Sequence, residues 1–95
     1  MSDLSERVER YLRLKEEALS VLSIGVPRDS FLYAFASDCL DMARRYFSDA
    51  EHFHSVGDDI NALSAINYAY GWIDAGVRLG VLDGKGDHRL FTHYR

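Results

Sequence analysis

The sequence predicts an all-α fold, namely an up-down-up three-helix bundle with a short C-terminal tail docked on it. Apolar residues recur every three or four positions through three long stretches, which is the period of an amphipathic helix. Only one proline interrupts the chain, and no stretch alternates at the period of two that is typical of a strand. We therefore expect one domain over residues 1–95, with helices at about 3–24, 29–55 and 59–82. The connections are short, so neighbouring helices should be antiparallel.

The first predicted helix opens with Asp3-Leu4-Ser5-Glu6, which has the pattern of a capping box. Charged residues fill the side opposite its apolar stripe and indicate a solvated face. Gly25 can end this helix in the left-handed conformation, and Pro27 disfavours helical geometry immediately before it. The apolar stripe consists of Leu4, Val8, Tyr11, Leu12, Ala18, Leu19 and Leu22.

The second predicted helix begins near Asp29 or Ser30, because either side chain can cap its first turn. It continues to about Ser55, and Gly57 ends it. Its apolar residues follow a regular three-four alternation: Phe31, Phe35, Cys39, Met42, Tyr46, Ala50 and Phe53.

The third predicted helix begins at Asp58-Asp59 and ends at Gly80 or Gly84. Gly71 and Gly76 each cost about 1 kcal/mol relative to alanine inside a helix. We therefore expect a packing reason for them, such as a neighbouring helix or a large ring against the backbone. The stripe is Ile60, Leu63, Ile66, Tyr70, Ile73 and Val77, and beyond the helix Leu90 and Phe91 are expected to dock on the bundle.

The composition restricts the class of protein. An apolar content of 47% is that of a globular chain, and a net charge of -4 gives no general affinity for nucleic acid. Cys39 is the single cysteine, which excludes an internal disulfide and a cysteine-based zinc site. No apolar run approaches the roughly 20 residues of a membrane span, and the polar N-terminus is unlike a signal peptide. We expect a cytoplasmic protein that binds neither nucleic acid nor membranes.

Two segments resemble an archaeal family of small helical proteins catalogued as domain of unknown function 357. The similarity runs through Met42–Phe53, Gly57-Asp58, Ala62 and then Tyr68–Gly80. The string Tyr-Ala-Tyr-Gly-Trp-Ile-Asp-Ala-Gly is its most specific part. The resemblance implies a three-helix bundle from an archaeal cytoplasm. It implies no activity, and no catalytic residue is carried over from it.

Tyr46, Asp49, Tyr70 and Asp74 form the most suggestive polar set. Tyr46 and Asp49 share one face of the second helix, and Tyr70 and Asp74 share one face of the third. In antiparallel neighbours the carboxylates could lie near the phenols. The set then has two interpretations. One is a small pocket in which a raised carboxylate pKa supports acid–base chemistry. The other is a hydrogen-bond network that fixes helix register, which we favour.

Acidic and imidazole side chains gather around the end of the second helix. Glu51 and His54 have the spacing found in di-iron bundles, but those bundles need two such pairs and further glutamates from four helices. We therefore predict no metal and no cofactor, and interpret the group as a solvated helix end where histidines suit the dipole. Its members are Asp49, Glu51, His52, His54, Asp58 and Asp59.

Arg45 followed by His52 loosely resembles the arginine-histidine spacing of the small helical HEPN ribonucleases. The resemblance implies an RNA-cleaving bundle. The alternative is a surface arginine that pairs with Asp41 or Asp49, which suits an acidic chain better.

Aromatic residues make up 13% of the chain, which is more than one small core needs to bury. Exposed aromatic side chains favour a protein-binding surface, and a symmetric homodimer is the usual form of one. The sequence therefore predicts a non-enzymatic interaction or self-associating module. The alternatives are a ligand-binding or enzymatic bundle that uses the Tyr/Asp set, and the HEPN-like nuclease. Candidate surface aromatics are Tyr11, Tyr33, Trp72 and Tyr94.

Overall fold

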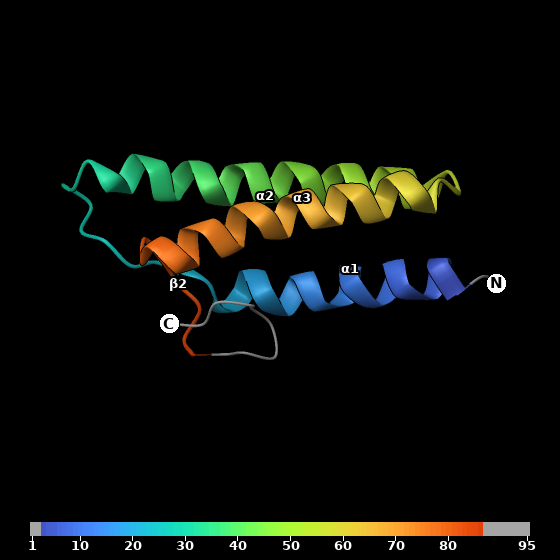
Figure 1. Ribbon diagram of the computed structural model, residues 1–95, viewed down its shortest axis with the longest axis horizontal. Helices are drawn as coiled ribbons and strands as arrows, with labels where there is room; N and C mark the ends of the chain where they lie inside the picture. The colour runs from blue at the N-terminus through green and yellow to red at the C-terminus, as the bar shows by residue number, and fades with distance from the viewer. Residues whose placement is uncertain (1–2, 87–95) are drawn as a thin grey trace.

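Three helices lie side by side along the long axis of the computed structural model, whose described residues are 3–86 (Figure 1). They are α1 (Asp3–Val21), α2 (Leu32–Ser55) and α3 (Asp59–Leu79). The bundle measures 47 × 22 × 17 Å. This confirms the predicted all-α helical bundle. The predicted docking of the C-terminal tail through Leu90 and Phe91 lies outside the described residues.

Helices α2 and α3 form an antiparallel hairpin with the most extensive contact in the molecule, and α1 packs less extensively on both. The buried sides of α2 and α3 are rich in alanine, which allows two helix axes to approach closely. Larger side chains fill the rest of the core. The buried alanines are Ala36, Ala43 and Ala50 on α2 and Ala62, Ala65 and Ala69 on α3.

The connection between α2 and α3 is tight because two local signals fit together. Gly57 adopts φ 81°, the left-handed conformation that ends a helix at little cost for glycine. Asp58 then caps α3, since its carboxylate accepts a 3.2 Å hydrogen bond from the Asn61 amide. At the far end Gly80 adopts φ 83° and ends α3, as its sequence position predicted.

The prediction of no strand was wrong, because β1 (Ser23–Ile24) pairs antiparallel with β2 (Leu82–Asp83). Strands of two residues are too short to show an alternating pattern, so hydrophobic periodicity could not predict them. The pairing also shortens the first predicted helix, which ends at Val21 instead of residue 24. Gly25 is not left-handed, and its amide instead donates a 2.8 Å hydrogen bond to the Val81 carbonyl.

The second helix begins at Leu32, later than the expected residue 29. The Ser30 amide donates to the Pro27 carbonyl at 2.9 Å, so this segment forms a turn first. The Ser30 hydroxyl accepts a 3.2 Å bond from the Leu32 amide within this turn. The N-cap residue of α2 is Phe31, which has no side-chain cap, so the predicted cap by Asp29 or Ser30 was wrong.

The two glycines inside α3 have different surroundings. A β-carbon built on Gly76 would lie 2.5 Å from Cδ1 of Leu82, so the Leu82 side chain packs directly on the helix backbone. The expected packing reason therefore holds for Gly76, although the neighbour is an aliphatic side chain and not a ring. A β-carbon on Gly71 would meet nothing within 4 Å among the atoms the structure describes. Gly71 needs another explanation.

We predict opposite effects for alanine at these two positions. Gly76→Ala should destabilise the fold by about 1–3 kcal/mol, because Leu82 must move. Gly71→Ala should stabilise the isolated chain by about 0.5–1 kcal/mol through helix propensity. Urea unfolding at low protein concentration measures both. Equal effects of the two variants would contradict the packing described here.

Candidate functional site

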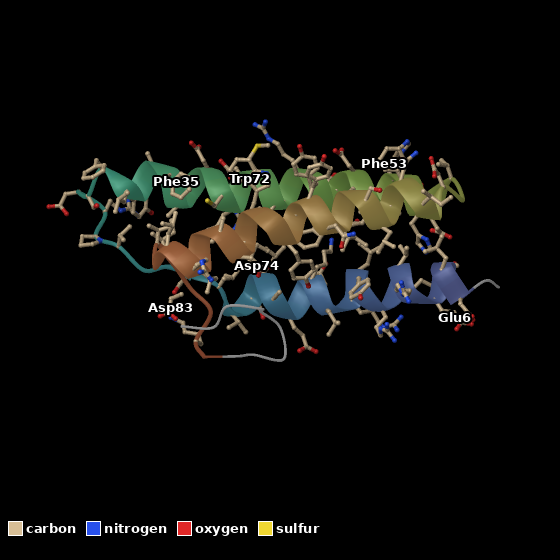
Figure 2. The ribbon with its side chains drawn as sticks, viewed as in Figure 1. Glu6, Phe35, Phe53, Trp72, Asp74 and Asp83 are labelled. Carbon is tan, nitrogen blue, oxygen red and sulfur yellow. The ribbon has the colours of Figure 1, made fainter. Side chains whose placement is uncertain are left out.

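The structure divides the predicted polar set between two sides of the bundle. Tyr70 and Asp74 are close enough to interact, and Asp74 lies between α3 and α1 in Figure 2. The Tyr70 ring meets the Phe47 ring edge to face, with centroids 5.4 Å apart. Burial, then the Asp74 carboxylate, then Tyr11, raise the pKa of Tyr70 to about 12. At neutral pH this phenol therefore keeps its proton and can donate a hydrogen bond but not act as a base.

Tyr46 and Asp49 lie elsewhere. Tyr46 is half-buried and stacks on Tyr68, with ring centroids 5.2 Å apart, whereas Asp49 is exposed. Because α2 and α3 are antiparallel with Tyr46 opposite Tyr68, Asp49 is level with a residue near 65 or 66. That level is about two helical turns, roughly 12 Å, from Asp74. The register thus separates the two carboxylates that a shared acid–base site would need.

The Tyr70 phenol should titrate late. Its folded pKa is raised, so its contribution to stability is complete below the unfolded value of 10.0 and is lost as the pH rises towards about 12. Ultraviolet titration of the phenols should show a component near pH 12 that Tyr70→Phe removes. Tyr68→Phe, at an exposed position of the same helix, is the matched control and should leave that component in place. A late component that survives Tyr70→Phe would contradict the assignment.

The acidic and imidazole group at the end of α2 does not converge on one point. Among residues 3–86, no three histidine, cysteine, aspartate or glutamate side chains are placed to share a metal ion. Glu51 pairs with Lys15 of α1, and Asp58 caps α3. His54 instead joins all three helices. Its Nδ1 lies 2.6 Å from Oδ1 of Asp59, and its Nε2 lies 3.5 Å from Oε1 of Glu9.

The hydrogen bond to Asp59 is the main cause that raises the pKa of His54. Protonated His54 donates to both carboxylates, and this stabilisation is complete below the unfolded value of 6.5 and is lost as the pH rises through the higher folded value. His54→Gln should therefore destabilise the fold by about 1 kcal/mol or less at acidic pH, and by less at alkaline pH. Denaturant unfolding over a pH series measures this difference. His52→Gln, at an exposed position, is the control, and an effect that grows with pH would refute the interpretation.

Arg45 and His52, the pair that resembled the HEPN spacing, both lie exposed on α2. Arg45 lines a groove with Trp72 and Asp41, and the salt bridge of Asp41 goes to Arg44 at 3.7 Å. The His52 ring lies near Phe53, with centroids 6.0 Å apart. Neither position has a described contact that sets up acid–base chemistry.

The most unusual surface is the side of α3 that faces neither α1 nor α2, here called the outer α3 face. Ile60 is 72% exposed, Tyr68 63% and Leu79 66%, although side chains of this kind are normally covered. No residue between Asp59 and Asp74 is charged, so the face lacks the charges that usually solvate a helix. Its exposed residues are Ile60, Asn61, Ser64, Asn67, Tyr68, Gly71, Ala75, Arg78 and Leu79.

Two grooves adjoin this face, and Trp72 lines both. The first groove lies along α3, has a volume of about 470 Å³ and passes over Gly71. The second, of about 410 Å³, lies between α2 and α3 beside Phe35 and Met42. Figure 2 shows Trp72 at the boundary of α2 and α3, on the opposite side of α3 from Asp74. The open space over Gly71 therefore lies beside Trp72, and beyond Trp72 is the second groove, which Asp38, Asp41 and Arg45 also line.

Sequence reasoning did not find this surface. It assigned the surface aromatics to Tyr11, Tyr33 and Trp72, which are all only partly exposed, and to Tyr94, which lies outside the described residues. Within residues 3–86 the exposed aromatic residues are Phe31 and Tyr68. The useful signal was the charge-free run between Asp59 and Asp74, because a helix without a charged side is expected to be covered all round.

Fold and surface together define a small all-α bundle whose third helix carries no charged residue from Ile60 to Ile73, on either its buried side or its outer side. Residues 10–82 match the family described as "Protein of unknown function (DUF357)", and the chain belongs to that family. The match extends from within α1 to β2 and confirms the resemblance seen in the sequence. Comparison with curated proteins and with solved structures gave no match. Of the helices within residues 3–86, none is long and apolar enough to cross a membrane.

Proposed function

We propose that this chain is a non-enzymatic interaction module of an archaeal cytoplasm, and that it binds a helix of a protein partner on the outer α3 face. The observation that carries the proposal is the uncharged stretch of this exposed helix face, from Ile60 to Ile73, in a chain of which 27% is charged. Charged residues are depleted from the cores of protein interfaces, where they would lose hydration. Tyr68, Trp72 and Arg78 are of the types enriched there.

The shape of the surface favours a helix as the bound element. Ser64, Gly71 and Ala75 have small side chains or none, and they follow one another along the first groove. A shallow channel of this kind admits the ridge of a second helix. Tyr68 and Trp72 flank the channel and supply rigid apolar area, which is how grooves commonly hold an amphipathic helix.

The ligand-binding alternative depends on Tyr70 and Asp74, since the structure separates Tyr46 and Asp49 from them. Burial keeps the Tyr70 phenol protonated, which suits a hydrogen-bond donor in a packed interface between α3 and α1. This supports a structural role for that pair and leaves the outer α3 face as the better candidate.

An arginine introduced into the face should abolish binding. Ser64→Arg places a charge in the middle of the first groove, and Ser20→Arg places the same residue on the exposed side of α1. Light scattering of the purified chain, with affinity capture from an extract of the source organism, should reveal a complex with wild type and with Ser20→Arg. In Ser64→Arg that complex should weaken about tenfold or more, the equivalent of about 1.4 kcal/mol.

The proposal fails if neither self-association nor a captured partner is detected, or if Ser64→Arg retains the complex as well as wild type. Circular dichroism of both variants provides the folding control, because both positions are exposed helix sites where arginine fits sterically.

A further inference from the structure

We propose that the partner of the outer α3 face is a second copy of this chain, with the two α3 helices packed antiparallel about a two-fold axis. This inference rests on the proposed function and adds the identity of the partner and its register. Three features of α3 support a second copy: a seven-residue spacing on its exposed side, the symmetry of that spacing, and the charge and area of the face.

The repeat follows the exposed side of α3. Its positions are separated by alternating steps of three and four residues, which places them on one strip of the helix surface, here called the seam. All six are exposed, so the seam is separate from the stripe that packs on α2. In order they are Asn61, Ser64, Tyr68, Gly71, Ala75 and Arg78.

The seam is complementary to its own reverse. In an antiparallel pair with two-fold symmetry, every contact occurs twice. If residue i of one copy contacts residue j of the other, then residue j of the first copy contacts residue i of the second. With the axis placed between Tyr68 and Gly71, the large Tyr68 ring lies over the open space at Gly71 of the second copy. The next layer outward pairs two small residues, Ser64 and Ala75. The outermost layer pairs two polar residues, Asn61 and Arg78.

The dimer explains why glycine stands at position 71, because Tyr68 of the second copy packs on it. Nothing in the described part of the single chain does so. Its β-carbon position is empty in the described structure, and it lies in the first groove beside Tyr68. Glycine costs stability in a helix, and close approach of a large side chain is a usual reason to retain it. Gly76 shows the same kind of packing within the chain, where the Leu82 side chain lies against the glycine backbone.

The charge of the face selects this partner over an unrelated basic or acidic protein. The chain carries a net charge of -4, so most pairings of its surfaces would bring like charges together. The outer α3 face avoids this, since it is uncharged between Asp59 and Asp74. Its one charged seam position, Arg78, is cationic, lies at the end and meets the neutral amide of Asn61. The pairing therefore places no like charges opposite each other in the seam.

The area of the face sets the strength of the dimer. A helix of 21 residues is about 30 Å long and presents a strip about 10 Å wide, so α3 alone covers roughly 300 Å² per copy. The second groove, which Asp38, Asp41 and Arg45 line together with Phe35 and Met42, widens the contact towards α2. A standard interface buries about 800 Å² per partner, so a dimer held by this strip belongs to the weak, transient class.

Cysteine cross-linking tests the register directly. In a Cys39→Ala background, which removes the native buried thiol, Ser64→Cys and Ala75→Cys are made as separate chains. Mixed and oxidised, the two should form a 64–75 disulfide in high yield. Neither chain should cross-link to itself. In this register position 64 of one copy lies level with position 75 of the other, so the two 64 positions are 11 residues, or about 16 Å, apart along the helix axis.

Gly71→Leu provides an independent test by sedimentation. Its side chain would occupy the space assigned to Tyr68 of the second copy, so the dimer should weaken by about tenfold or more. The single chain should remain folded at low concentration, because that space is open. Ser20→Arg, on the far helix, should dimerise like wild type.

A chain that stays monomeric at all concentrations overturns this inference, and so does cross-linking of Ser64→Cys to itself, which indicates a parallel pair. The proposed function is judged separately. If the chain is monomeric but a different protein is captured through the face and lost in Ser64→Arg, the function stands and the second copy does not. If Gly71→Leu leaves the dimer unchanged, the proposed register is wrong.

Discussion

The antiparallel pairing of α2 with α3 is the constraint on which the rest of the structure depends. Alanines on both buried sides bring the two helices close, and two ring pairs fix how far one helix is shifted along the other. Phe47 meets Tyr70 edge to face, and Tyr46 stacks on Tyr68. Once this register is set, Tyr70 points to the α1 side, Tyr68 emerges on the other side, and the outer α3 face is left without a cover in the single chain.

The first helix is held differently, and its attachment shows how little of the core it supplies. Its buried residues are Val8 and Ala18. Polar contacts hold it on either side of its middle. Glu9 meets His54 there, and Lys15 pairs with Glu51 and places its amine 6.0 Å from the Phe47 ring centroid. At the other end the β1–β2 pairing ties the segment after α1 to the segment after α3. The bundle is therefore a tight helix pair with a third helix fastened on it.

Periodicity was enough to predict three helices, because each apolar stripe repeats over several turns and glycines mark two of the helix ends. It could not predict which polar residues meet across helices. Tyr46, Asp49, Tyr70 and Asp74 share suitable faces within each helix, but the ring pairs set a register that separates Asp49 from Asp74. The β1–β2 pairing has only two residues per strand and joins segments far apart in the sequence. No local sequence pattern therefore predicts it. Gly71 and Gly76 look alike in sequence, and only the position of Leu82 distinguishes them.

The exposed faces of α1 and α3 differ in their content of charged residues, although both belong to the same chain. The exposed side of α1 carries charges of both signs, among them Arg7, Arg10 and Glu16, as expected for a face that stays in water. The exposed side of α3 has the same length scale and the same solvent access, yet carries no charge from Ile60 to Ile73. Composition cannot explain the contrast, because both faces belong to one acidic chain. The difference in charge is explained if the α1 face stays in contact with water and the α3 face is covered by another protein surface.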